Sequence, residues 1–185
     1  MPQMTNVQGI RICNGIEEMF GQTDALEFAE ALPLSKSADY LRKYKWAKEV
    51  CAYLEAKYTP EQIKILRMSC SCHVGDKEKT NTKRIYDEAG SLDEFCEKYN
   101  DVYSTLHPVW YEGEALFFSY PTCYCSCVKR VSGPVSPTWC LCTLGYAKEL
   151  FDYVLGCDTE VELIESVKAG GSRCVIKIMK IQNNA

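Results

Sequence analysis

A cysteine-rich segment, 120–142, constrains this 185-residue chain more than any other stretch, because it holds five of the twelve cysteines within 23 residues. In its first half, cysteine alternates with other residues, which predicts a strand over 122–129 with three sulfurs on one face. Its second half follows a proline- and glycine-containing turn and predicts a helix over 138–156 that begins near two more cysteines. The five residues are Cys123, Cys125, Cys127, Cys140 and Cys142.

Helix signals dominate the first hundred residues. Asn14 is a candidate cap for a first helix that Gly21 interrupts, and Thr59-Pro60 is a cap followed by proline at the first helical position. Ser91 begins a capping-box pattern. Together with the apolar spacing, these signals predict five helices, over about 16–32, 37–58, 60–68, 83–89 and 92–100.

Beyond residue 100 the chain becomes rich in β-forming residues. Such segments lie on both sides of Glu112-Gly113-Glu114 and again on both sides of Gly170-Gly171, which predicts two hairpins. The expected fold class is therefore α+β, with a helical N-terminal half, 1–100, packed on a small antiparallel sheet with one long crossing helix, 101–185. The length suits a single domain over 1–185.

Charge and hydropathy exclude several classes of protein. A net charge of −4 without a dense Lys/Arg stripe predicts no nucleic-acid partner. No apolar run approaches the ~18 residues that a spanning helix needs, so no membrane partner is expected. The N-terminal residues lack the layout of a signal peptide, which predicts a cytoplasmic protein. Disulfides are rare in that reducing compartment, so clustered cysteines there indicate metal binding or redox chemistry.

Three closely spaced groups of cysteines are candidate metal ligands. Soft thiolates, with His73 beside one group, suit zinc or, alternatively, an iron–sulfur cluster. The spacing C-x-C is less specific than paired C-x-x-C. The predicted ligands are Cys70, Cys72, Cys125, Cys127, Cys140 and Cys142.

Thiol chemistry is a competing interpretation of the same residues. If Thr138 caps the helix, Cys140 lies at its positive end, where the macrodipole lowers the pKa of a thiol. A cysteine can also pack as a small hydrophobic residue without any chemistry. The sequence alone does not decide between metal binding, a reactive thiol and a buried structural cysteine.

Aromatic residues surround the cysteine-rich segment. They could line an apolar pocket between the sheet and the 138–156 helix, or they could form an ordinary core. The predicted ligand-binding residues are Trp110, Tyr120, Tyr124, Trp139 and Tyr146.

The C-terminal third resembles a known family over about residues 115–180. The motif W-C-x-C-T-x-G-Y, followed by an E-V-E-L hairpin that ends G-G-S-R-C-V-I-K-I, is similar to the 4-vinyl reductase and L-2-amino-thiazoline-4-carboxylate hydrolase-like family. That resemblance implies a small ligand-binding fold with zinc near the pocket. Its ligands would be a helix-start cysteine together with an acid and two cysteines around the final hairpin. The matching positions are Cys140 or Cys142, Glu162 or Glu165, Ser166 in place of a cysteine, and Cys174.

The function predicted from these features is small-molecule binding beside a cysteine-rich zinc or iron–sulfur site, in a monomer or a homodimer. The resemblance implies an enzyme alternative, a hydrolase of a small cyclic amide or thiazoline-type compound. There, metal-bound water or a Cys140 thiolate would attack, with His73 or Glu165 as the base. A third alternative is a structural or interaction protein in which zinc ties the two halves together.

Overall fold

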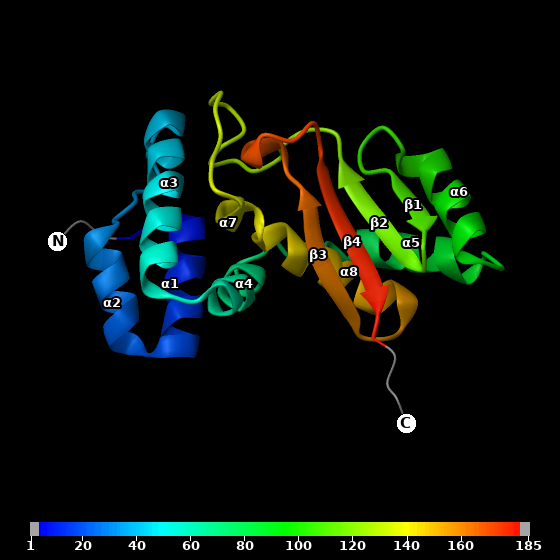
Figure 1. The fold of residues 1–185 in the computed structure, drawn as a ribbon, viewed down its shortest axis with the longest axis horizontal. Helices are drawn as coiled ribbons and strands as arrows, with labels where there is room; N and C mark the ends of the chain where they lie inside the picture. Colours follow the sequence, from blue (N-terminus) through cyan, green and yellow to red (C-terminus); the bar gives the residue numbers. More distant parts are fainter. Residues whose placement is uncertain (1–3, 182–185) are drawn as a thin grey trace. The chain divides into compact units, whose positions relative to one another are not determined.

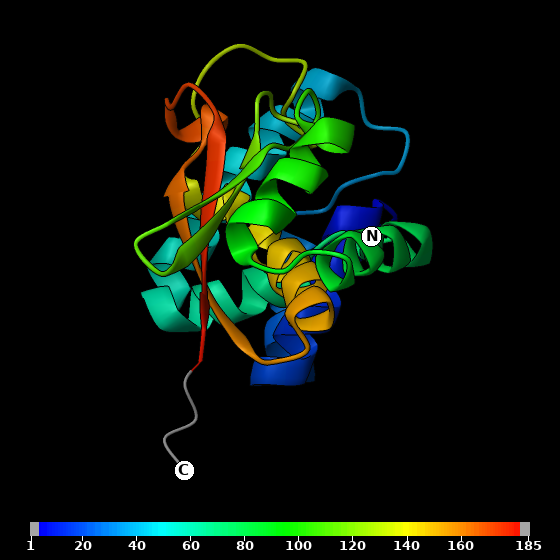
Figure 2. The same ribbon diagram turned by 90° about the vertical axis from the view of Figure 1, so that its right-hand side faces the viewer.

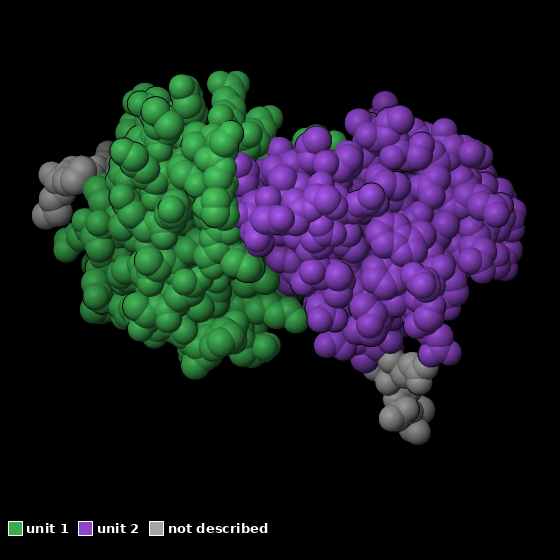
Figure 3. All heavy atoms as spheres, turned by 45° about the horizontal axis from the view of Figure 1, so that its top comes forward, with its two compact units in different colours: residues 1–71, 124–142 green, residues 72–123, 143–185 purple. Residues whose placement is uncertain are grey.

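The structure, a computed structural model, describes residues 4–181. The chain forms two compact units (Figure 3): unit 1 contains the residues up to 71 together with 124–142, and unit 2 contains 72–123 together with the chain from 143 onward. The predicted fold class is confirmed, because a helical N-terminal half precedes a small antiparallel sheet in an α+β fold (Figure 1). The single domain over 1–185 stays a prediction. Among the described residues, no helix is long and apolar enough to cross a membrane.

Unit 1 begins with a helical hairpin made of α1 (Val7–Phe20) and α2 (Gln22–Ala31), as Figure 1 shows. The side chain of Asn6 caps α1, and Gly21, with a φ of 95°, separates the two helices. The predicted cap at Asn14 is wrong, because Asn14 lies inside α1. The predicted break at Gly21 is confirmed.

The next two helices follow the sequence signals closely. Helix α3 (Tyr40–Lys57) is capped by Asp39, and α4 (Pro60–Ser69) begins at the predicted proline. A complete capping box closes the start of α4, since the Thr59 hydroxyl accepts from the backbone of Gln62 and the Gln62 side chain accepts from the backbone of Thr59.

Replacing Thr59 by alanine should destabilise the protein by about 1 kcal/mol, because the start of α4 then loses an acceptor for one of its unpaired N–H groups. Thr59→Ser keeps the hydroxyl and should leave the stability nearly unchanged, because serine caps a helix at least as well as threonine. Urea denaturation of both variants measures the difference. Equal stabilities of the two variants would contradict the role of the cap.

The predicted cysteine strand over 122–129 is wrong. Residues 121–130 form a loop and a turn, in which the carbonyl of Cys125 accepts from the N–H groups of Val128 and Lys129, at 3.2 and 2.9 Å. The sheet has ended at Tyr120, and the local turn satisfies backbone groups that a strand would have paired with a neighbour. Alternation alone therefore did not define a strand, and the three sulfurs do not share a sheet face.

The predicted helix over 138–156 is interrupted at Leu141. A short helix, α7 (Pro137–Cys140), precedes α8 (Cys142–Leu155). The cap of α7 is Ser136, whose hydroxyl accepts from the N–H of Thr138, so the predicted cap at Thr138 is wrong. Cys140 ends a four-residue helix and does not lie at the start of a long one, which removes the macrodipole argument for its reactivity.

Unit 2 contains two helices that precede its sheet. Helix α5 (Asp76–Asp87) begins earlier than the predicted segment 83–89. Helix α6 (Leu92–Tyr103) begins as predicted, with the Ser91 hydroxyl accepting from the backbone of the third helical residue. The predicted fifth helix is thus confirmed.

Four antiparallel strands form the sheet of unit 2. The turn between the first two is the predicted one, with left-handed φ values of 55° at Gly113 and 66° at Glu114. The second predicted hairpin is also confirmed, with a short 3-10 helix, η1 (Val167–Ala169), in its connection. In space the order is β1 (Val109–Glu112), β2 (Ala115–Tyr120), β4 (Cys174–Lys180) and β3 (Thr159–Glu165).

Helices cover one face of this sheet. Figure 2 shows α6 and α8 on the same side of the strands, and the ring of Phe118 in β2 lies 5.4 Å from that of Phe151 in α8. Neighbouring residues of a strand point to opposite faces, so Phe117 lies on the other side. There it stacks on Trp110 of β1, with ring centroids 5.1 Å apart.

Candidate thiol site around Arg67

A buried arginine organises the interior of unit 1. Arg67 of α4 is 1% exposed, and its Nη2 donates to the carbonyl of Trp139 at 2.9 Å. Its Nε donates to the carbonyl of Thr138 at 3.4 Å, and the guanidinium carbon lies 4.7 Å from the centroid of the Trp139 ring. No hydrogen-bond partner for Nη1 is found among the described residues. The arginine therefore retains an unsatisfied donor in a buried place, where such a group is costly.

Thiols surround the guanidinium. Burial by itself lowers the pKa of Arg67, but electrostatic interaction with nearby sulfurs opposes this effect, and the net shift of its pKa is upward. A buried positive charge favours the thiolate form of its neighbours. The cysteines involved are Cys142, Cys70, Cys51 and Cys125.

Trp139 of α7 connects the arginine to these thiols. It is 1% exposed and packs edge-to-face against Trp46, with ring centroids 5.8 Å apart. Its indole Nε1 donates to the Sγ of Cys125 at 3.4 Å. Its carbonyl, which accepts from Arg67, also accepts from the Sγ of Cys142 at 3.6 Å. Trp139 therefore contacts both Arg67 and the sulfurs of Cys125 and Cys142.

Cys125 is the cysteine whose thiolate these contacts favour. A hydrogen bond from the Cys127 thiol lowers the pKa of Cys125 well below the usual value, against the opposing effect of burial. The indole of Trp139, the backbone N–H of Cys127 and the charge of Arg67 lower it further. The pKa of Cys127 is raised instead, because it donates to Cys125 and is 3% exposed. These contacts thus favour a thiolate at Cys125 and a protonated thiol at Cys127.

The other buried thiols of the site remain protonated. Burial raises the pKa of Cys51 to about 12, although Arg67 opposes the shift. Burial also raises the pKa of Cys70, whose Sγ donates to the carbonyl of Arg11 at 3.4 Å. The site therefore singles out Cys125, which is also partly exposed and can meet a reactant.

The turn that contains Cys125 and Cys127 suits a bond between their sulfurs. Two residues apart in a helical turn, Cα atoms are about 5.4 Å from each other. Disulfides need Cα separations of about 4.4–6.8 Å. This spacing permits a disulfide, and the two side chains, which diverge at positions two apart in a helical turn, must turn toward each other for the bond to close.

The predicted metal site is wrong. Among residues 4–181, no group of three or more His, Cys, Asp or Glu side chains is placed to hold a metal ion. Cys70 is buried in unit 1, whereas Cys72 is an exposed residue of unit 2. Within unit 1 several of these sulfurs interact with the fixed positive charge of Arg67, which disfavours a second cation beside it. Zinc and iron–sulfur are therefore set aside, and with them the zinc-stabilised structural role.

The predicted catalytic residues lie in different environments. The His73 side chain is 82% exposed, and its Nδ1 lies 3.6 Å from a carboxylate oxygen of Glu149. Glu165 accepts from the backbone N–H groups of Ser172 and Arg173, and these bonds lower its pKa, so its carboxylate closes the loop between β3 and β4. Both belong to unit 2, and Cys140 belongs to unit 1, where its role as a nucleophile stays a prediction.

The predicted aromatic residues are also distributed. Trp110 stacks on the helix-free face of the sheet, Tyr124 is 49% exposed, and Trp139 belongs to the thiol site. Tyr120 and Tyr146 interact in unit 2, where burial raises the pKa of Tyr120. The hydroxyl of Tyr146 donates to Glu78 there, at 2.6 Å.

Sequence reasoning missed Arg67, although the sequence carried a signal for it. Ile63, Leu66 and Cys70 share one face of α4 and are each at most 4% exposed. Arg67 occupies the same face, because residues i, i+3, i+4 and i+7 of a helix lie together. An arginine inside an apolar stripe is a candidate for a buried functional cation.

Comparisons with known proteins were informative at the level of the family. A model described as "Family of unknown function (DUF6144)" matches residues 2–185. No curated protein matches the chain significantly. The similar solved structures include a mutant H-NOX domain from Shewanella oneidensis in the Fe(II)CO ligation state, with a TM-score of 0.46 and 10% identity over 97% of this chain and all of that one.

Two further H-NOX structures from Shewanella oneidensis are similar to this chain at equally low TM-scores and identities. One, in the Fe(II)CO state, has a TM-score of 0.43 and 11% identity over 97% of this chain and 100% of that chain. The other, a mutant in the Fe(II) state, has a TM-score of 0.43 and 11% identity over 96% of each chain. At such low values the likeness carries no statement about a ligand of this chain.

The resemblance to the 4-vinyl reductase family is wrong. The family model that matches nearly the whole chain is a different one. The resemblance rested on short motifs in one third of the sequence, which a turn, a helix start and a hairpin can share by chance. The thiazoline hydrolase alternative and the zinc ligands around Cys174 depended on it and are withdrawn.

Proposed function

The chain belongs to the DUF6144 family, whose function is unknown, and from this premise we propose that it is a thiol–disulfide exchange protein. Cys125 is the attacking thiolate in this proposal, and Cys127 is the resolving thiol. The substrate is a small disulfide-containing molecule.

The hydrogen bond from the Trp139 indole to Cys125 carries the proposal. An indole N–H can only donate, so a contact of 3.4 Å to the Sγ of Cys125 favours the form of sulfur that accepts more strongly, which is the thiolate. The charge of Arg67 acts in the same direction. A thiolate present at neutral pH is the species that attacks a disulfide.

The proposed exchange proceeds in two steps that balance. The Cys125 thiolate attacks one sulfur of the substrate disulfide, which forms a mixed disulfide and releases the other half as a thiolate that takes a proton from water. Cys127 then loses its proton to water, and its sulfur attacks the Sγ of Cys125, releasing the second half as a thiolate that also takes a proton from water. The substrate is reduced to two thiols while the Cys125–Cys127 pair is oxidised to a disulfide. A second dithiol reverses these steps and regenerates the protein.

Accessibility supports the assignment of the two roles. Cys125 is partly exposed, whereas Cys127 is 3% exposed, so a reactant meets Cys125 first. The resolving thiol is already within hydrogen-bonding reach of the sulfur that it would attack. A dithiol that cycles in this way needs a reducing compartment, so we propose the cytoplasm as its location. The absence of a nucleic-acid partner and the homodimer stay predictions.

Single serine variants test the proposal with an aromatic disulfide whose released thiolate is coloured. The wild type should release a second equivalent of coloured thiolate as the internal disulfide closes. Cys127→Ser should stop at the mixed disulfide, visible as a mass added to the peptide containing Cys125. Cys125→Ser should lose the fast phase of the reaction.

Cys96→Ser is the matched control, because Cys96 is a buried thiol of unit 2 whose pKa burial raises to about 11. This variant should react like the wild type. If the first mixed disulfide forms on another cysteine, or if Cys127→Ser still releases the second equivalent, the assignment of the dithiol is wrong.

A further inference from the structure

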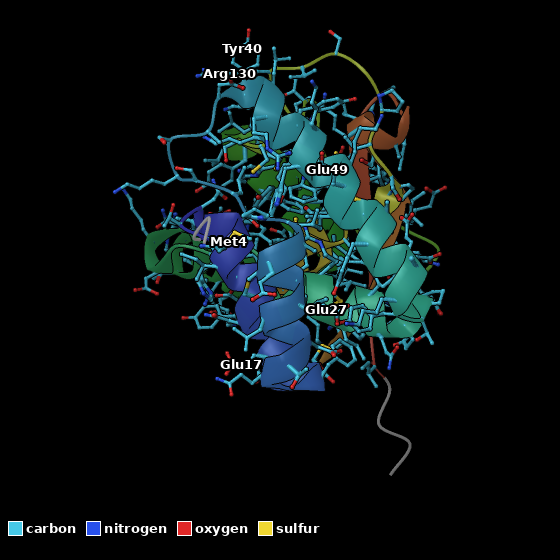
Figure 4. The ribbon with its side chains drawn as sticks, turned by 90° about the vertical axis from the view of Figure 1, so that its left-hand side faces the viewer. Met4, Glu17, Glu27, Tyr40, Glu49 and Arg130 are labelled. Atoms are coloured by element: carbon cyan, nitrogen blue, oxygen red, sulfur yellow. The ribbon has the colours of Figure 1, made fainter. Side chains whose placement is uncertain are left out.

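A groove runs along the helical hairpin of unit 1. It has a volume of about 370 Å³ and is lined by residues of α1 and α2 and by Met4. Its lining includes Ile10 and Leu26, which are 41% and 57% exposed. Large apolar side chains gathered in a surface hollow are typical of a binding site. Figure 4 shows this side of the molecule, with α1 and α2 toward the viewer.

Two carboxylates lie among the residues that line the groove. Glu17 lies near the end of α1, and Glu30 lies near the end of α2. Because the two helices form a hairpin, these ends lie toward opposite ends of the groove, and Figure 4 shows Met4 and Glu17 toward opposite ends of α1. Neither carboxylate forms an ion pair or side-chain hydrogen bond with another described residue. Each is therefore available for a cationic partner.

The helical hairpin that carries this groove is acidic, and two of its carboxylates, Asp24 and Glu27, pair with Lys57 outside the groove lining. Residues 4–32 contain five carboxylates and a single arginine, so this hairpin alone accounts for the net charge of −4 of the whole chain. Such a field attracts cationic partners and disfavours nucleic acids and anionic membranes.

We propose that the groove between α1 and α2 binds an amphipathic helix of a partner protein. Apolar side chains of that helix enter the groove beside Ile10 and Leu26, and lysine or arginine side chains at its margins meet Glu17 and Glu30. An amphipathic helix suits a hollow lined by two helices because its apolar residues recur every three to four positions along one face. The surface lies in unit 1 and is independent of the proposed thiol exchange.

A designed peptide is the probe for this surface. It has about 20 residues, enough for an isolated helix, with a leucine face flanked by lysines. A control peptide has the same leucines flanked by glutamates. Fluorescence anisotropy at low salt should show binding of the lysine peptide, and binding should weaken as salt is added. No binding of the lysine peptide, or equal binding of both peptides, overturns the proposal.

Substitutions in the groove test whether the lysine peptide binds there. Leu26→Asp should weaken the binding of the lysine peptide at least about tenfold, because the complex loses a leucine contact and buries a charge. The matched control is Leu41→Asp in α3, because Leu41 is 49% exposed but does not line the groove. The double variant Glu17→Lys, Glu30→Lys should reverse the preference in favour of the glutamate peptide. Equal effects of Leu26→Asp and Leu41→Asp would show that the binding is nonspecific and overturn the proposal.

Cys13 provides a second readout at the same place. This partly exposed thiol lines the groove, and burial, together with Cys70 and Glu17, raises its pKa to about 11. Bound peptide should slow the alkylation of Cys13 at alkaline pH and leave that of Cys125 unchanged. If the chain instead self-associates in sedimentation experiments and Leu26→Asp abolishes this, the groove accepts a second copy and the proposed partner is wrong.

Discussion

Trp139→Ala should destabilise unit 1 by about 3–5 kcal/mol and should also make Cys125 far less reactive at neutral pH. The stability loss follows from removing a large side chain that is 1% exposed and packs against Trp46, which leaves a cavity in the core. The loss of reactivity follows from removing the indole donor to Cys125 and disturbing the position of Arg67. Urea denaturation measures the first effect, and the rate of alkylation of Cys125 measures the second.

Two phenylalanine variants separate packing from hydrogen bonding. Trp139→Phe keeps an aromatic ring but removes the donor to Cys125, so the pKa of Cys125 should rise and its alkylation at neutral pH should slow. Trp46→Phe removes an indole that donates to the carbonyl of Leu32 at 2.8 Å and makes no such bond to a thiol. It should lose stability while Cys125 stays reactive. If both variants slow the alkylation of Cys125 equally, a general loosening of the core explains the effect and the hydrogen bond from Trp139 does not.

Arg67→Met should lower the rate of Cys125 alkylation by up to about tenfold at pH values below the Cys125 pKa of about 6, because there each unit by which the pKa rises lowers the thiolate fraction about tenfold. The guanidinium helps to keep the pKa of Cys125 below its usual value, and methionine supplies no charge. In the wild type, the rate of alkylation should stay high down to the lowered pKa of Cys125, because the thiolate predominates above that pKa. The rate should fall only when the pH drops below it. In the variant, the whole profile of rate against pH should shift to higher pH.

The same variant should also lower the free energy of unfolding, because the carbonyls of Thr138 and Trp139 lose the donors that Arg67 supplies. A shift of the pH profile to higher pH is therefore the signature of an electrostatic role for Arg67. Arg42→Met is the control, because Arg42 pairs with Glu49 at the surface, where its side chain is 40% exposed. A loss of stability in Arg67→Met with an unchanged pH profile would contradict the proposed role.

Local signals in the sequence predicted the secondary structure well where a cap or a turn residue was present. Thr59 and Ser91 start their helices as predicted, and Gly113 makes the predicted turn. The predictions failed where a pattern had two local solutions. Alternating cysteines suited a strand, but the backbone of Cys125 closes a turn. Asn14 could cap a helix, but Asn6 does so earlier in the chain.

The sequence by itself determined the α+β class, the starts of α4 and α6, and the abundance of thiols. The tertiary structure alone decided which thiol is set apart, because the pKa of a sulfur depends on charges and donors near it in space. Trp139 and Arg67 reach Cys125 from positions 14 and 58 residues away in the chain. Spacing along the sequence carries no record of such contacts, so the cysteine pattern indicated sulfur chemistry without showing that a buried arginine stands among the thiols.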